Sequence, residues 1–209
     1  MSKKNLYFMK SIMVFYLVAL FSVAFSEEKS QPFCTMENVA ISYEYYGDDK
    51  GETKLKIKDY GAYVLREDNR VMTSYGEAKE YRYFCLLTPS DFFQADLHDS
   101  NMVVKNARPA NMEDIILFHE ILYGKQADSF EKEKRYQKRN DESVAGQLCH
   151  VYHDSTEAVT YWVWNHIILK EEYIDWETKK PSGKRAVSVN VNPDFQKDAF
   201  SLPEGLEII

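Results

Sequence analysis

Alternating apolar and polar residues predict β-strands along most of the first hundred residues. Residues 54–58 show the pattern most clearly, because three lysines alternate with Leu55 and Ile57. Such alternation is typical of an antiparallel sheet with one face in solvent. In residues 37–46 the apolar members of the alternation are Val39, Ile41, Tyr43 and Tyr45. Further strands are predicted over residues 63–66, 71–75, 79–88, 92–97 and 102–105, with turns at 47–51 and 59–61.

A helical pattern follows at residues 111–124. Asn111 is a favourable N-cap, acidic residues occupy the first turn, and Gly124 is a favourable stop. The apolar residues of this block are Met112, Ile115, Ile116, Phe118, Ile121 and Leu122. So broad an apolar surface predicts a buried helix. Residues 128–141 are mostly charged and predict a solvated helix or a mobile loop.

Strand patterns return after residue 144. Residues 148–152 and 159–164 predict a hairpin, and residues 167–176 predict the next strand. Residues 181–183 predict a turn, and residues 186–191 a strand whose three valines share one face. The expected fold class is mainly β (α+β). It consists of one antiparallel sheet of about eight to eleven strands, curled around one or two helices, since long open sheets tend to curl.

The predicted strand at residues 159–164 is bulky on both faces. Tyr161 lies on the same face as its valine neighbours, whereas Trp162 and Trp164 point to the other face. Such a strand is either covered by core packing on both sides or covered on one side and exposed to a ligand cavity on the other. Both interpretations remain open.

The first 26 residues have the features of a secretory signal. Three lysines precede an uncharged apolar run at residues 11–25, and small residues at positions 24 and 26 form a cleavage site. The run is short for a membrane span, which needs about 20 residues. We therefore expect residues 1–26 to be a signal peptide cleaved near Ser26 and residues 27–209 to form a single domain. An uncleaved anchor is the alternative.

Export would place the three cysteines in an oxidising compartment. Cys34, Cys85 and Cys149 all follow the cleavage site, so one disulfide and one free thiol are possible, with three alternative pairings. The other interpretation is that all three are small buried apolar residues.

Composition excludes several classes of protein. The chain has 209 residues, 26 basic and 33 acidic, with a net charge of −7. An acidic balance argues against a nucleic-acid binder, which needs a basic surface. The low mean hydropathy of −0.49 excludes a polytopic membrane protein, and the many aromatic residues argue against disorder.

Catalytic and metal-binding motifs fail on geometry. His119-Glu120 begins like a zinc-protease helix, but the second histidine is missing, and we expect His119 to be a core residue. On a strand, Cys149, His150 and His153 cannot chelate together, because neighbours point to opposite faces and residues four apart are about 13 Å apart. Serine-nucleophile, P-loop and dinucleotide motifs are missing from the sequence. We expect no enzyme, no metal site and no cofactor.

Several short motifs carry a family resemblance. They are Asp59-Tyr60-Gly61, Val144-Ala145-Gly146, Cys149-His150-Val151-Tyr152, Trp162-Val163-Trp164, Leu169-Lys170-Glu171-Glu172, the strand at 187–191, and Phe200-Ser201-Leu202-Pro203-Glu204-Gly205. With them the chain resembles a family of exported bacterial proteins of unknown function. That family is similar in fold to the outer-membrane lipoprotein carriers of the LolA and LolB type. The resemblance implies a half-open β-barrel whose concave face is plugged by helices, and in those carriers the concavity holds acyl chains. The sequence departs from the family pattern at residues 165–167 and in its longer, charged helical block.

We therefore expect a periplasmic, non-catalytic binding or carrier protein of a Gram-negative bacterium. Its ligand would be a lipid, an acyl chain or a lipidated protein, with at most transient membrane contact and no nucleic-acid partner. An apolar cavity can bind such a ligand without a special polar motif, since burial of apolar surface contributes roughly 25 cal/mol per Å² to the binding free energy. The candidate ligand-binding residues are Tyr43, Tyr45, Ile115, Phe118, Tyr161, Trp162 and Trp164. The alternative function is an envelope module that binds another protein and no small molecule.

Overall fold

A computed structural model describes residues 34–74, 77–98, 100–109, 118–122 and 125–209. They fall within one compact unit that spans Pro32–Ile209. The predicted signal peptide and its cleavage site lie outside the described residues, as does Ile115.

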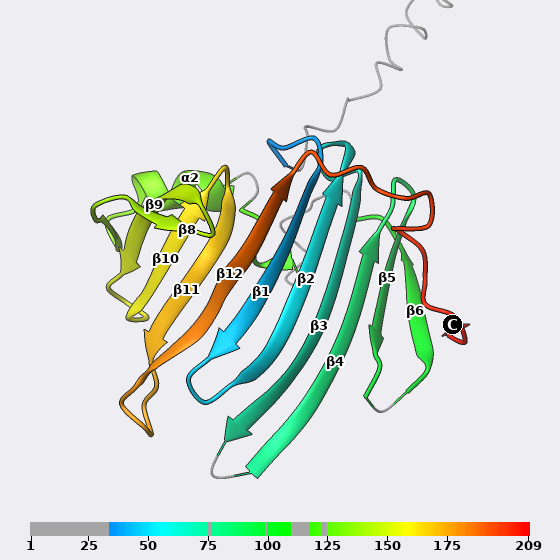
Figure 1. Cartoon of the computed structure of the whole chain (residues 1–209), viewed down its shortest axis with the longest axis horizontal. Coiled ribbons are helices and arrows are strands. Elements are labelled where there is room, and N and C mark those ends of the chain that lie inside the picture. Colours follow the sequence, from blue (N-terminus) through cyan, green and yellow to red (C-terminus); the bar gives the residue numbers. More distant parts are fainter. Residues whose placement is uncertain (1–33, 75–76, 99, 110–117, 123–124) are drawn as a thin grey trace, which may run out of the picture. The chain divides into compact units, whose positions relative to one another are not determined.

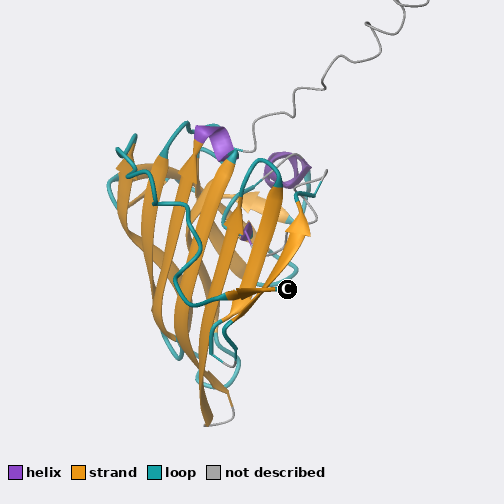
Figure 2. Ribbon diagram, turned by 90° about the vertical axis from the view of Figure 1, so that its right-hand side faces the viewer, coloured by secondary structure: helices purple, strands orange, loops and turns teal. Residues whose placement is uncertain are grey.

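The described residues build one sheet of thirteen strands, which is not closed into a barrel (Figures 1 and 2). The strands of the first half are β1 (Val39–Tyr46), β2 (Lys50–Lys58), β3 (Tyr63–Ser74), β4 (Glu77–Leu87), β5 (Asp91–Asp96) and β6 (Met102–Ala107). Those of the second half are β7 (Tyr136–Lys138), β8 (Glu142–Val144), β9 (Gln147–Asp154), β10 (Val159–Trp164), β11 (Ile167–Ile174), β12 (Pro181–Val191) and β13 (Glu207–Ile208). In space the order is β13-β6-β5-β4-β3-β2-β1-β12-β11-β10-β9-β7, with β8 paired to β9.

The prediction of a mainly β, largely antiparallel fold is confirmed, with four corrections. The sheet has thirteen strands, whereas about eight to eleven were expected. The sheet is mixed, because β13 pairs with β6 in parallel. The predicted strands at 63–66 and 71–75 are one strand, β3, which pairs with β2 through the charged residues between them. The predicted turn at 181–183 lies inside β12, where Ser182 and Gly183 are buried and paired with β11.

The described part of the predicted helical block is not α-helical. Residues 118–122 contain a short 3₁₀ turn and then a β-bridge between Ile121 and Ile167. The Leu122 amide donates to the His166 carbonyl, and the Ile168 amide donates to the Glu120 carbonyl, each at 2.8 Å. The start of β11 has no partner in β12, since their pairing begins at Lys170. Its backbone groups therefore bond residues 120–122 instead, and this outweighs the helical pattern of the sequence.

One short α-helix, α2 (Lys125–Lys132), occurs among the described residues. It lies partly in the stretch for which we predicted a solvated helix or a mobile loop. The helix is not solvated all round, because Phe130 is buried and stacks on Tyr136, with Tyr152 and Tyr161 edge-on to its ring.

Cross-strand pairing divides the sheet into an inner and an outer face. We define the inner face by Tyr43, since residues directly opposite one another share a face. The main apolar core includes Ile41, Leu55 and Val64 and is covered by Phe118. On the outer face, Leu65, Phe84, Leu86, Phe93, Ala95 and Val103 form a second cluster, covered by the C-terminal residues Phe200, Leu202 and Leu206.

Candidate functional site

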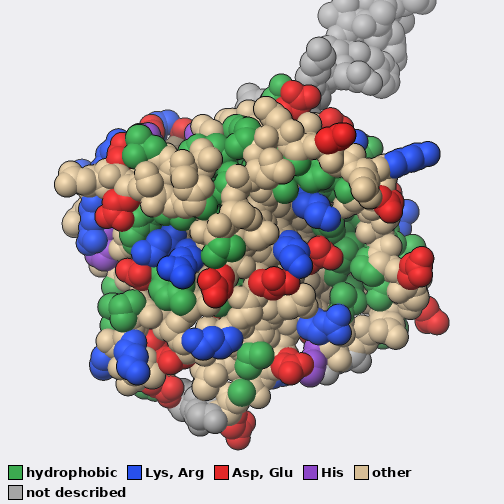
Figure 3. Space-filling view, in the orientation of Figure 1, with side chains coloured by type: hydrophobic (Ala, Val, Ile, Leu, Met, Phe, Trp, Pro, Cys, Tyr) green, Lys and Arg blue, Asp and Glu red, His purple; other side chains and the backbone are tan. Residues whose placement is uncertain are grey.

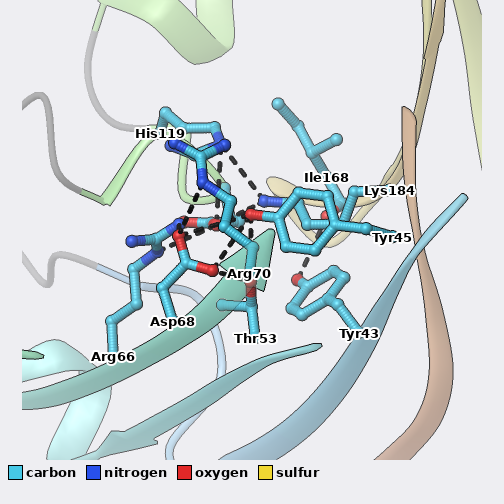
Figure 4. A network of polar contacts seen from close by, with 10 residues as sticks. Tyr43, Tyr45, Thr53, Arg66, Asp68, Arg70, His119, Ile168 and Lys184 are labelled. Carbon is cyan, nitrogen blue, oxygen red and sulfur yellow. Dashed lines mark hydrogen bonds and ion pairs between the residues drawn. The ribbon is translucent and has the colours of Figure 1, made fainter. Parts of the chain in front are cut away.

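A cluster of buried charges occupies the inner face beside the apolar core (Figure 4). Arg66 and Asp68 are two residues apart on β3 and so point to the same side. Lys184 comes from β12, and Glu120 from the 118–122 segment. Their side chains are only 6, 2, 1 and 0% exposed, in that order. We call these four residues the ion cluster.

Glu120 joins the two cations of the ion cluster. Its Oε1 accepts a hydrogen bond from Lys184 Nζ at 2.5 Å and another from Arg66 Nε at 3.0 Å. Its second oxygen, Oε2, is buried and has no hydrogen-bond partner. Because both cations come from the sheet, Glu120 ties the 118–122 segment to the inner face through a single oxygen atom.

Asp68 is the second anion of the ion cluster and accepts hydrogen bonds from three directions. Arg66 Nη2 donates at 3.0 Å, Thr53 Oγ1 at 3.1 Å and Tyr45 Oη at 3.2 Å. Arg70 Nε lies 3.8 Å from the same carboxylate. Two cations and two anions are therefore balanced in a region with little water, which is the condition for tolerating buried charge.

The pKa shifts follow from this arrangement. Desolvation alone would raise the pKa of Glu120, but the positive charges of Lys184 and Arg66 hold that pKa well below its ordinary value. Burial would lower the pKa of Lys184, whereas Glu120 raises it, and the net shift is upward. The pKa of Arg66 is also raised, because Glu120 and Asp68 outweigh its desolvation. These three groups therefore stay charged at neutral pH.

His119 differs from its prediction as a core residue. Its side chain is 45% exposed, because the described residues 118–122 do not continue the predicted helix that would have turned it inward. Its Nε2 lies 3.1 Å from Lys184 Nζ, which suits a neutral imidazole that accepts a hydrogen bond from the ammonium group. Glu120 favours the charged ring, but desolvation and the charge of Lys184 outweigh that effect and lower the pKa of His119.

A small hollow opens on the inner face next to the ion cluster. It measures about 290 Å³ and is lined by Tyr83, Cys85, Gln94, Ala95, Asp96, Met102 and Val104. On β4, Cys85 lies directly opposite Arg66, and Tyr83 lies opposite Asp68. The two apolar residues from β6 are unusually accessible, with Met102 48% and Val104 39% exposed. We call this space the inner hollow.

The candidate residues from β1 and the 118–122 segment lie within the packed interior. Tyr43 is buried, and its hydroxyl donates to the Ile168 carbonyl at 3.1 Å. Burial raises the pKa of this hydroxyl well above its ordinary value. Tyr45 bonds to the ion cluster, and Phe118 packs edge-on against Phe92 in the main core.

The three candidates on β10 lie on opposite faces, as the alternation predicts. Tyr161 packs inward against Phe130, whereas Trp162 lies on the other face and donates from Nε1 to Glu142 at 2.8 Å. Trp164 is half-buried against the main core. Core packing covers the Tyr161 face of this strand, whereas Trp162 on the other face also lines a surface hollow. The described candidates do not line one common cavity.

The cysteines are all free thiols in the buried interior. Neither a disulfide nor any of the three possible pairings is present, so the alternative of small buried residues is the one observed. Desolvation raises the pKa of Cys85 to about 12 and that of Cys149 to about 11.

The ion cluster was not predicted from the sequence. The sequence of β3 does contain a signal for two of the cluster's four residues. Arg66 and Asp68 follow Val64 at every second position, so they lie on the same inward-facing side of the strand. Charges at core positions of an alternating strand are unusual and can be noticed. Glu120 and Lys184 carry no such signal, because the partners that neutralise them lie more than fifty residues away in the sequence.

Among the residues that the structure describes, no three His, Cys, Asp or Glu side chains are grouped as a metal ion would require. No helix in the described part of the chain combines the length and the apolar composition of a membrane span.

Comparisons with known proteins find similar structures but no sequence relatives. No protein-family model matches the chain, and no curated protein matches it either. A solved structure of an uncharacterized conserved protein from Thermus thermophilus has a TM-score of 0.49 at 7% identity, covering 84% of this chain and 91% of that one. The crystal structure of MucB has a TM-score of 0.44 at 9% identity, and the match covers 84% of this chain and 60% of MucB.

Proposed function

We propose that this chain is an exported, non-catalytic binding or carrier protein for a ligand with an apolar chain. The ligand class is a lipid, an acyl chain or a lipidated protein, which the protein would hold in the periplasm of a Gram-negative bacterium. The observation that carries the proposal is the inner hollow, in which apolar side chains are left accessible on the inner face of the sheet.

The dimensions and lining of the inner hollow support an apolar chain as ligand. At about 290 Å³, the hollow is near the lower end of the range of about 300–1,000 Å³ for ligand pockets. Each methylene group buried there would contribute about 0.8 kcal/mol. Met102 is an adaptable wall for such a chain, because its unbranched side chain can take several shapes. This site differs from the residues first expected, since Tyr43 and Phe118 are already covered by other parts of the protein.

The ion cluster supports the same function by forming a rigid boundary. It holds the 118–122 segment on the inner face and fills the half of that face next to the apolar core. A ligand is therefore restricted to the β4–β6 half. The polar groups at this boundary, Asp68 and Arg66, are already paired with each other and with their neighbours. Contacts to a polar head group would instead come from the polar residues that line the inner hollow, Tyr83, Gln94 and Asp96.

The first experiment is native mass spectrometry of the protein purified from the envelope fraction. We expect adducts whose masses match acyl chains or lipids. A labelled dodecanoate probe should also bind, with fluorescence that reports an apolar environment. A protein that carries no adduct and does not bind the probe would exclude the carrier function and leave the interaction module.

A pair of matched variants locates the site. Val104 and Val191 are almost equally exposed, at 39 and 38%, but only Val104 lines the inner hollow. Val104→Lys should weaken probe binding at least tenfold, because it places an ammonium group where the apolar chain packs. Val191→Lys should leave binding unchanged. Equal effects of the two variants would contradict the inner hollow as the site.

A further inference from the structure

Strand β12 loses one of its two neighbours halfway along its length. It pairs with β1 from Gly183 to Val191, but with β11 only from Pro181 to Arg185. Among the described strands, none pairs with the β11-facing edge of β12 from residue 186 to residue 191. Figure 1 shows β11 and β12 separating above their paired halves. We call residues 186–191 the open edge.

Two features of the structure keep the strands apart. The register between β1 and β12 shifts by one residue, so that Ser42 faces Ser188 while Tyr43 faces Ala186. Val187 is the extra residue of this β-bulge, and a bulge bends and twists its strand. On the other side, residues 120–122 already occupy the start of β11. The β-bulge and the 120–122 segment therefore together keep the open edge unpaired with β11.

The chemistry of the open edge suits pairing with another strand. Its sequence, Ala-Val-Ser-Val-Asn-Val, has no charge and no proline. Edge strands of natural sheets usually carry charged residues or proline, which prevent another strand from pairing with them. About half of the amide and carbonyl groups of an antiparallel strand point away from one neighbour. In the open edge these groups face away from β1, and Val187 is 52% exposed.

A surface hollow of about 490 Å³ adjoins the open edge. It is lined by Tyr46, Glu142, Ser143, Val144, Ala145, Trp162, Lys170, Glu172, Arg185, Ala186 and Val187. Each of its charged groups already has a partner: Lys170 lies 3.0 Å from Glu172, Arg185 lies 3.7 Å from Glu44, and Glu142 accepts a hydrogen bond from Trp162 at 2.8 Å. Figure 3 shows basic and acidic side chains interspersed on the face of the molecule drawn in Figure 1. A hollow whose charges are already paired favours an uncharged occupant. An added charge would lose its hydration without gaining an opposite charge to pair with.

We propose that the open edge binds an extended, uncharged segment of a partner protein as an added β-strand. Its backbone would pair with residues 186–191, and alternate side chains would enter the adjoining hollow. Six residues correspond to about 20 Å of extended chain. A folded second copy fits less well, because other parts of the chain lie on either side of the open edge: β8 contacts β12, and residues 120–122 are bonded to the start of β11. An extended segment needs less room there than the edge of an intact sheet.

Hydrogen exchange in the intact protein tests this proposal directly. The probe is the peptide acetyl-Thr-Val-Ser-Val-Thr-Ala-amide, and the readout is the exchange rate of each backbone amide from 187 to 191. In the free protein, alternate amides of this stretch should exchange quickly. Saturating peptide should slow them at least tenfold. The same peptide with alternate N-methylated amides should give no such protection, since it cannot donate to a strand edge.

Matched lysine variants supply the second measurement. Val187→Lys places a charge on the open edge and should weaken peptide binding at least tenfold. Leu148→Lys, at another exposed strand position, should leave it unchanged. Amides that are already slow in the free monomer would mean that another part of the chain covers the edge. Protection that depends on protein concentration would indicate a second copy. Either result, or a lack of peptide protection, overturns the proposal.

Discussion

Removing the charge of Glu120 should destabilise this protein strongly. The substitution Glu120→Gln keeps the size of the side chain and one acceptor oxygen but removes the negative charge. Arg66 would then keep only Asp68 as a buried ion-pair partner, and Lys184 would keep only the weaker influence of Glu171. Breaking a buried ion pair on one side costs about 3–5 kcal/mol, because the other charge is left uncompensated.

That free energy is large compared with the stability of a typical domain, about 5–15 kcal/mol. With a urea slope of about 2 kcal/mol per M, a loss of about 4 kcal/mol lowers the unfolding midpoint by about 2 M. The assay is urea unfolding followed by tryptophan fluorescence. Glu77→Gln, at an exposed position on β4, is the control and should shift the midpoint very little.

The charge of Glu120 should also make the stability of the protein depend on pH. The pKa of Glu120 is lower in the folded protein than its ordinary value of 4.5. Its stabilising contribution is therefore fully present above that ordinary value and is lost as pH falls below it. The wild-type protein should lose stability on acidification more steeply than Glu120→Gln does.

The double variant Glu120→Gln with Lys184→Met separates charge from packing. It removes one charge of each sign, so it should be less destabilised than the sum of the two single variants. The reasoning would be refuted if Glu120→Gln cost less than about 1 kcal/mol, or if its acid-induced loss of stability matched that of the wild type.

Three further outcomes test other parts of the structure. Tyr45→Phe should cost about 1–3 kcal/mol in urea unfolding, because Asp68 loses a buried hydrogen-bond donor; an unchanged midpoint would remove Tyr45 from the network. Phe130→Ala should cost about 3 kcal/mol and increase hydrogen exchange in α2 and β7, since its ring holds that helix against the sheet; a uniform change across the sheet would contradict this local role. All three cysteine thiols should react slowly with a maleimide at pH 8 in the native protein, because burial raises their pKa values. In urea without reductant, all three should react quickly. Fewer than three reactive thiols in urea would reveal a disulfide.

Strand prediction succeeded where the pattern is local. The alternation in β1 and β2, the β9–β10 hairpin and the opposite faces of Tyr161 and Trp162 are all confirmed. These features depend on the two-residue period of a strand and on turn residues nearby, which the chain carries within a few positions.

Prediction failed where distant segments compete for the same backbone groups. Residues 118–122 have a helical pattern, yet the unpaired start of β11 binds them as a bridge. In the same way, the valines of β12 look equivalent in the sequence, but the bulge leaves Val187 exposed and Val189 half-buried. Local propensity is a weak preference that tertiary hydrogen bonding can override.

The sequence by itself determined a mainly β chain with strands in nearly the observed places, because side-chain alternation is written residue by residue. Only the tertiary structure decided that Glu120 and Lys184 become buried partners, that the inner hollow lies at β4–β6, and that β12 keeps an open edge. Each of these depends on which distant strands meet and in what register. A one-residue shift in register changes every contact of a strand, and that choice is made by the packing of the whole sheet.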